Sequence, residues 1–135
     1  MYKMTDPFLQ LRKSHRRETA EDYVELVYEL ISQKKQARLI DIARKMQVSK
    51  VTAHKILSRL QKEGWIESAP YRNIGLTQKG LQMAKKSKKR HQIVFSFLKK
   101  LGISEKTARV DAEGIEHHVS QATLKTMQNF IRSHA

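Results

Sequence analysis

Hydrophobic residues recur at spacings of three and four along most of the chain, which is the periodicity of amphipathic α-helices. A first helix is predicted from about Thr19 by a stripe of four apolar residues: Val24, Val27, Leu30 and Ile31. Residues 1–18 precede this pattern and form an N-terminal extension that contains a basic run, Arg12–Arg17. The run is either a solvated arm or a contact to a DNA backbone, and the pattern leaves both open.

The next two apolar stripes have the pattern of a helix-turn-helix. A short amphipathic helix carries Leu39, Ile42, Ala43 and Met46. The turn Gln47–Ser49 follows, and Ser49 is a suitable N-cap for a second helix that ends at Gly64. This second helix has an apolar stripe of its own: Val51, Ile56, Leu57 and Leu60. Two short helices joined by a tight turn predict a helix-turn-helix.

The periodicity then changes to that of short strands. Trp65–Ser68 and Ile74–Leu76 predict two strands, and Pro70–Asn73 predicts the turn between them. A hairpin that follows a helix-turn-helix is typical of a winged helix. Tyr71 and Arg72 would lie at the tip of this wing.

The remainder predicts three helices. A long helix from about Gln78 to Leu101 is basic in its first half and apolar in its second, and Ser104 and Ser120 can cap the last two. The middle one is expected to run through His117 or His118. The predicted fold class is mainly α, with an N-terminal winged helix-turn-helix, a small β-hairpin wing and a C-terminal helical dimerisation domain. The expected division is residues 1–18 (extension), 19–77 (DNA-binding) and 78–135 (metal-binding and dimerisation).

Composition indicates the kind of partner. The chain has 27 Lys and Arg against 13 Asp and Glu, a formal net charge of +14, which favours a polyanion. No apolar run approaches the roughly 20 residues of a membrane span, and the start lacks the apolar core of a secretory signal. We therefore expect a cytoplasmic protein that binds nucleic acid and no membrane. The chain has no cysteine, which excludes thiolate metal sites.

The second helix of the predicted motif would read DNA. Residues near its N-terminus are expected to reach base edges in the major groove: Lys50, Thr52, Ala53 and His54. Lys55, Arg59 and Arg72 are expected to contact the phosphate backbone, and Tyr71 at the wing tip is a further expected DNA contact. For any one of these residues, a merely solvated surface is a competing interpretation. Helix-turn-helix proteins usually bind palindromic double-stranded DNA as dimers. The apolar faces of the last helices favour a homodimer, although a closed monomeric core would use the same residues.

Asp111–Ser120 carries the candidate chemistry. Glu113, Glu116 and His117 lie at i, i+3 and i+4, so a helix brings all three to one face. Two carboxylates and an imidazole that converge suit a first-row divalent metal. His91 on the long helix would face inward, where a lone histidine is more often part of the core.

Four segments in this order resemble the MntR manganese transport regulators of the diphtheria-toxin-repressor family: Glu21–Ile31, Gly75–Gly80, Arg90–Leu98 and Asp111–Ser120. The resemblance runs from about Thr19 to the C-terminus. It implies one shared metal site built from six residues: Asp22, Glu25, His91, Glu113, Glu116 and His117. Without the resemblance, Asp22 and Glu25 would be read as solvated helix charges.

The resemblance also bears on the metal and the domains. It implies Mn²⁺, with one or two ions per chain and two favoured. Iron-responsive relatives carry Met and Cys where this chain has Asp22 and Glu113, and hard carboxylates suit Mn²⁺ better than sulfur does. Because the chain ends at Ala135, the SH3-like third domain of the iron-type relatives is not expected.

These features predict a manganese-responsive repressor of manganese uptake genes. The alternatives are a winged-helix regulator that responds to Fe²⁺ or Zn²⁺, and a carboxylate/histidine metalloenzyme. We expect no enzyme and no small-molecule substrate, because the sequence has no nucleophile elbow, phosphate loop or HExxH pattern.

Overall fold

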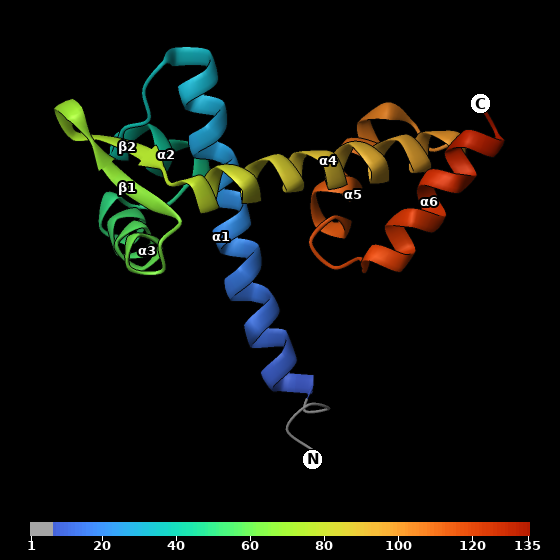
Figure 1. Cartoon of the computed structure of the whole chain (residues 1–135), viewed down its shortest axis with the longest axis horizontal. Helices are drawn as coiled ribbons and strands as arrows, with labels where there is room; N and C mark the ends of the chain where they lie inside the picture. Colours follow the sequence, from blue (N-terminus) through green and yellow to red (C-terminus); the bar gives the residue numbers. More distant parts are fainter. Residues whose placement is uncertain (1–6) are drawn as a thin grey trace. The chain divides into compact units, whose positions relative to one another are not determined.

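The computed structural model describes residues 7–135, and these form helices α1 to α6 and one two-stranded sheet (Figure 1). The chain divides into two compact units. Residues 15–85 make up the winged unit, and residues 86–135 together with residues 7–14 make up the helical unit. None of the described helices is both long and apolar enough to cross a membrane.

Helix α1 (Pro7–Lys34) begins twelve residues before the predicted start at Thr19, so the start predicted from the sequence was wrong. The reason is that four basic residues in its first turns, Arg12, Lys13, Arg16 and Arg17, are exposed and interrupt the apolar periodicity. Pro7 suits the first position of a helix, and the Leu and Arg residues after it are good helix formers.

In the winged unit, α2 (Leu39–Met46) and α3 (Lys50–Lys62) form the predicted helix-turn-helix. Gln47 takes a left-handed conformation after α2, and Ser49 caps α3 by accepting a hydrogen bond from the Thr52 N–H. Figure 1 shows both helices and the wing beside α1. Apolar residues of all these elements share one core: Val24, Val27, Leu30, Ile42, Leu57, Leu60 and Ile66.

The wing consists of β1 (Ile66–Ala69) and β2 (Asn73–Leu76), which pair antiparallel with Ile66 opposite Leu76. The three residues Pro70–Arg72 connect them. Tyr71 and Arg72 at this tip both have φ of +61°. Helix α4 (Gln78–Lys100) follows, and Gly80 is required there because a Cβ would lie 1.9 Å from the Trp65 carbonyl oxygen.

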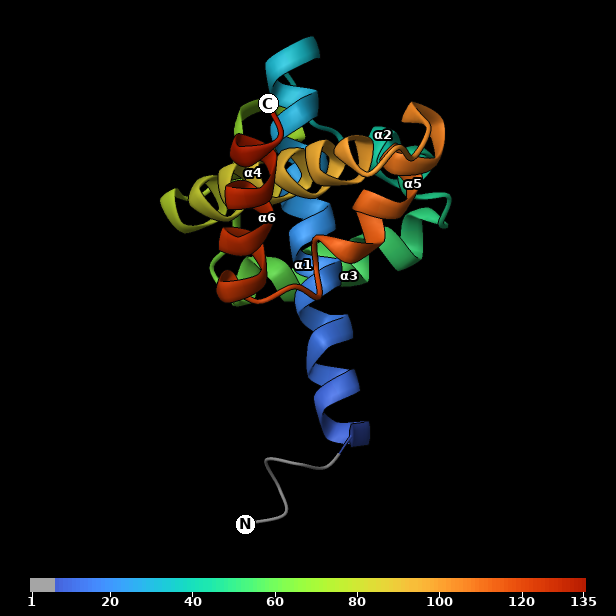
Figure 2. The same cartoon turned by 90° about the vertical axis from the view of Figure 1, so that its right-hand side faces the viewer.

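The helical unit contains the second half of α4, α5 (Glu105–Ile115) and α6 (Gln121–Ser133), which lie side by side in Figures 1 and 2. Ser104 and Ser120 cap α5 and α6, as predicted. Its core is a separate cluster: Val94, Leu98, Ala108, Ala112 and Leu124.

The predicted fold class is confirmed: mainly helical, with a winged helix-turn-helix followed by a helical part. No third, SH3-like domain is present among residues 7–135.

Candidate metal centre and nucleic-acid interface

Three of the predicted ligands meet in the helical unit. His91 on α4 has its Nδ1 3.3 Å from an Oε1 of Glu113 and 3.3 Å from an Oε1 of Glu116. One ligand-type atom from each residue lies within 4.8 Å of the others. The Glu116 side chain is 1% exposed and that of Glu113 is 60% exposed, so the cluster has a buried wall and an open side.

The local fold positions these side chains. Ala108 and Ala112 are fully buried, and their small size lets α5 pack closely in the core of the unit. The Arg90 guanidinium donates to the Val119 carbonyl oxygen at 2.8 Å, which ties the segment after α5 to α4 one residue before His91. The His91 ring also stacks on Phe95, with 6.3 Å between ring centres.

Helix α5 ends at Ile115, two to three residues earlier than predicted. Glu116 is its C-cap and keeps helical angles, and its N–H still donates to the Ala112 carbonyl oxygen at 3.0 Å. His117 and His118 follow in a turn instead of continuing the helix. Gly114, three residues before His117 and a poor helix former, weakens the end of this helix.

The donor set fits a divalent metal. The His91 Nδ1 is hydrogen-bonded to the Glu116 Oε1 at 3.3 Å and lies 3.3 Å from the Glu113 Oε1. Ligand atoms bound at right angles about 2.1–2.2 Å from a cation lie about 3 Å apart. A buried carboxylate needs a positive partner, and oxygen with imidazole nitrogen donors suit Mn²⁺. His91, Glu113 and Glu116 could therefore hold such an ion.

The other three predicted ligands are distributed over both units. Asp22 and Glu25 lie half-buried on α1 in the winged unit, and His117 lies half-buried after α5. Burial raises the pKa of Tyr23 above its ordinary value, and the charge of the adjacent Asp22 adds to the shift. The shared six-residue site stays a prediction.

The exposed face of α3 differs from the predicted one at two positions. Lys50, Thr52, His54 and Lys55 are exposed. Ala53 is fully buried, so its predicted contact with bases was wrong. Val51, assigned from the sequence to the apolar stripe, is 66% exposed instead. The spacing of Ala53 from Leu57 and Leu60, four and seven residues, is the signal that could have identified the buried face.

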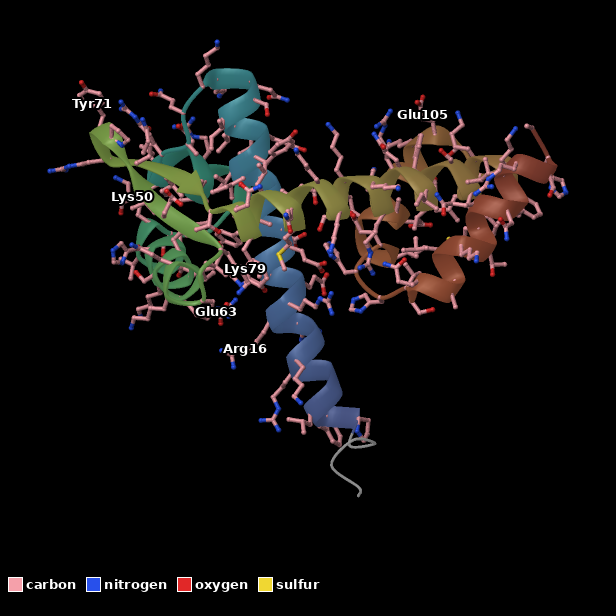
Figure 3. The ribbon with its side chains drawn as sticks, in the orientation of Figure 1. Arg16, Lys50, Glu63, Tyr71, Lys79 and Glu105 are labelled. Atoms are coloured by element: carbon pink, nitrogen blue, oxygen red, sulfur yellow. The ribbon has the colours of Figure 1, made fainter. Side chains whose placement is uncertain are left out.

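The remaining predicted DNA contacts lie on the wing and on the later part of α3. Tyr71, 88% exposed, and Arg72 project from the wing tip. Figure 3 shows Tyr71 at the far end of the hairpin and Lys50 at the beginning of α3. The Arg59 side chain is 30% exposed and its Nε lies 3.7 Å from a carboxylate oxygen of Glu63.

Two family models match this chain, and both describe domains of iron dependent repressors. Residues 16–74 match the family model described as the iron dependent repressor N-terminal DNA binding domain. Residues 77–134 match the iron dependent repressor metal binding and dimerisation domain.

Individual relatives agree with these matches. The transcriptional regulator MntR of Escherichia coli O6:H1 is 47% identical over 127 residues, which cover 94% of this chain and 82% of the relative. The HTH-type transcriptional regulator MntR of Geobacillus kaustophilus is 38% identical over 112 residues, 83% of this chain and 79% of the relative.

Solved structures have the same fold. The manganese regulator SloR superposes with a TM-score of 0.74 at 26% identity and 84% coverage of this chain. The IdeR protein of T. acidophilum superposes with a TM-score of 0.72 at 25% identity and 82% coverage. The chain spans about half of each of these solved chains, 53% in both cases.

A winged DNA-binding domain followed by a metal-binding and dimerisation domain defines a metal-dependent transcriptional repressor, and not an enzyme. Within that class, the chain belongs to the MntR-type regulators of the diphtheria-toxin-repressor family, as its sequence motifs indicated.

Proposed function

We propose that the protein represses manganese uptake genes by binding palindromic operator DNA as a Mn²⁺-loaded homodimer. The observation that carries this proposal is the cluster of His91, Glu113 and Glu116, with its buried carboxylate. The manganese regulators among its relatives support the choice of metal. Because its partner is chromosomal DNA, we propose that it acts in the cytoplasm.

We propose that the complete site adds Asp22, Glu25 and His117 to the cluster and holds two ions. All six side chains offer oxygen or imidazole nitrogen, the donors that Mn²⁺ accepts. This site would join the two domains, which we divide at residues 77 and 78.

The mechanism depends on the negative charges of four carboxylates. In the metal-free chain, Asp22 and Glu25 on α1 and the two glutamates of the cluster carry like charges, which repel one another. When bound, Mn²⁺ supplies the positive charge that offsets this repulsion. Helix α1 packs its apolar stripe into the same core as α2 and α3. A restraint on α1 therefore restrains α3 as well.

The coupling energy needed is modest. Two copies of α3 in a dimer must meet half-sites about one helical turn apart, roughly 34 Å. A typical allosteric coupling free energy is about 1–3 kcal/mol. If metal binding favours that spacing by this amount, operator affinity rises about 5–150-fold.

A titration of Mn²⁺ into chelator-stripped protein, followed by the electron paramagnetic resonance of free Mn²⁺, tests the site. We expect saturable binding of two ions per chain, weakened at least 100-fold in Glu116→Gln, beyond the 10–100-fold typical of outer-sphere changes. Glu105→Gln is the matched control, because Glu105 is an exposed carboxylate on the same helix α5. Equal binding by wild type and Glu116→Gln would contradict the assignment.

A selection from random-sequence duplexes with and without Mn²⁺ tests the DNA activity. Enrichment of a palindrome only with Mn²⁺ is the expected result, and metal-independent enrichment would refute the mechanism. Fe²⁺ is the second candidate, since both family models are described as iron dependent. The same selection under anaerobic Fe²⁺ distinguishes the two metals.

A further inference from the structure

The exposed beginning of α1 has a concentrated positive charge that the proposed metal switch does not use. Arg16 and Arg17 are exposed on this helix, and Arg12 and Lys13 precede them by one turn. From Pro7 to Arg17 the helix contains no acidic residue. A surface with one sign of charge indicates a partner of the opposite sign.

Arg16 lies against the C-terminal end of α3, within the winged unit. Its Nη2 is 3.7 Å from a carboxylate oxygen of Glu63, the C-cap of α3. The Arg59 Nη2 donates to the Arg16 carbonyl oxygen at 3.4 Å. The side chain of Arg16 remains 67% exposed in spite of these contacts, so its guanidinium can still reach a partner.

The same region continues onto α4. The Lys79 Nζ donates to the Glu63 carbonyl oxygen at 2.9 Å and lies 3.9 Å above the Trp65 ring. Figure 3 shows Arg16, Glu63 and Lys79 close together at this end of α3. A cleft of about 520 Å³ opens here, lined by Arg16, Arg17, Ala20, Glu63, Trp65, Lys79 and Met83. Three cations and one carboxylate therefore border it.

Basic residues on α3 lead toward this end of the helix. Lys55, Arg59 and Lys62 are spaced by four and three residues, so they follow one face of α3 toward its C-terminus. Arg16 meets this row at Arg59 and Glu63. The row and the beginning of α1 form one positively charged surface, which we call the basic shoulder: Arg16, Arg17, Lys55, Arg59 and Lys62.

We propose that Arg16 and Arg17 bind DNA phosphates at the edge of the groove that α3 occupies, which rests on the proposed DNA-binding function. Helix α3 has 13 residues and is therefore about 20 Å long, whereas the major groove is about 12 Å wide. With its first residues at the bases, its other end emerges at the phosphate backbone. Arg16 and Arg17 extend the protein's contact along that backbone without reading sequence.

The salt dependence of binding measures this contact. Each phosphate neutralised contributes about 0.9 to the slope of log affinity against log salt concentration. Two arginines from each subunit of a dimer contribute about 3.6. Between 50 and 200 mM salt, wild type should lose about 150-fold more affinity than a variant that lacks them.

The test compares Arg16→Gln/Arg17→Gln with wild type in the presence of Mn²⁺. The probes are a duplex enriched by wild type from a random pool and an unselected duplex of equal length. Lys106→Gln/Lys125→Gln, which removes two exposed charges from α5 and α6, is the matched control. We expect the slope to fall on both duplexes for the arginine variant and to stay unchanged for the control. An unchanged slope for the arginine variant overturns the proposal.

Glu63→Gln separates phosphate binding from a structural role of Arg16. If Arg16 only anchors α3 through Glu63, this substitution weakens binding as the arginine substitution does. If Arg16 binds phosphate, the loss of a negative charge beside the backbone tightens binding to both duplexes. Weaker binding by Glu63→Gln overturns the proposal. A wild type that enriches no sequence with Mn²⁺ refutes the proposed function instead, and the slope on the unselected duplex still tests the basic shoulder.

Discussion

The close approach of α4 to the wing predicts that Gly80→Ala destabilises the protein. A Cβ at this position would lie 1.9 Å from the Trp65 carbonyl oxygen and 3.0 Å from the Trp65 carbonyl carbon. Van der Waals contact for carbon begins near 3.5 Å, so the two segments must separate by more than about 1 Å. Because the obstacle is backbone, no side-chain rotation relieves it.

The separation affects three hydrogen bonds. The Trp65 carbonyl oxygen accepts from the Thr77 N–H at 3.2 Å and shares the Thr77 hydroxyl proton, at 3.1 Å, with the Gly64 carbonyl oxygen at 2.6 Å. The Thr77 hydroxyl oxygen in turn caps α4 by accepting from the Gly80 N–H at 3.0 Å. Each bond contributes about 0.5–1.5 kcal/mol, so their loss outweighs the gain of about 1 kcal/mol that alanine brings to a helix. The net expectation is a loss of about 2 kcal/mol.

Urea unfolding followed by circular dichroism measures this loss. With a slope near 2 kcal/mol/M, the midpoint should fall by about 1 M. Gly114→Ala is the matched control, because it makes the same change in helix α5 where no atom lies within 4 Å of the added Cβ. Its midpoint should rise. A Gly80→Ala midpoint at or above that of wild type would refute the reasoning.

Three further predictions follow from single side chains. Val51→Ala shortens an exposed residue, so it should leave stability unchanged but weaken operator binding about fivefold or more, by fluorescence anisotropy. Ser49→Ala removes the cap of α3 and should lower the free energy of unfolding by about 1 kcal/mol in urea. Mn²⁺ at 100 times its dissociation constant should stabilise wild type by about 2.7 kcal/mol, but Glu116→Gln with 100-fold weaker binding by only about 0.4, in thermal unfolding. Undiminished stabilisation of Glu116→Gln by the metal, unchanged stability of Ser49→Ala, or unchanged operator affinity of Val51→Ala would each contradict its prediction.

The sequence predicted the elements that bury an apolar face. The helix-turn-helix, the wing and the capped helices α5 and α6 all have such faces, and each was found within a few residues of its predicted position. The beginning of α1 was missed, because the exposed basic residues Arg12, Lys13, Arg16 and Arg17 interrupt any apolar period there. The early end of α5 was missed because the glutamate and histidine spacing fits a helix equally well whether or not the last turn forms.

The candidate site could be predicted only in part. The i, i+3 spacing of Glu113 and Glu116 brought them to one side of α5, but their approach to His91 depends on packing between α4 and α5. No periodicity encodes that distance. On α3, a stripe that combined Val51 with Leu57 was plausible from composition, since valine is apolar. The small Ala53 occupies the buried position instead, four and seven residues before the buried Leu57 and Leu60.

The left-handed backbone at the wing tip has an entropic consequence. Tyr71 and Arg72 both have positive φ in a connection of three residues, closed by a hydrogen bond from the Asn73 N–H to the Pro70 carbonyl oxygen. Such angles are unfavourable by about 1–2 kcal/mol for each residue, and this strain is accepted when the chain folds. Fixing the backbone of one residue costs about 1–2 kcal/mol of conformational entropy. At the wing tip this cost, too, is met when the chain folds. A DNA backbone that meets the wing therefore encounters a projection that is already shaped, and only side-chain rotamers remain to be ordered on contact.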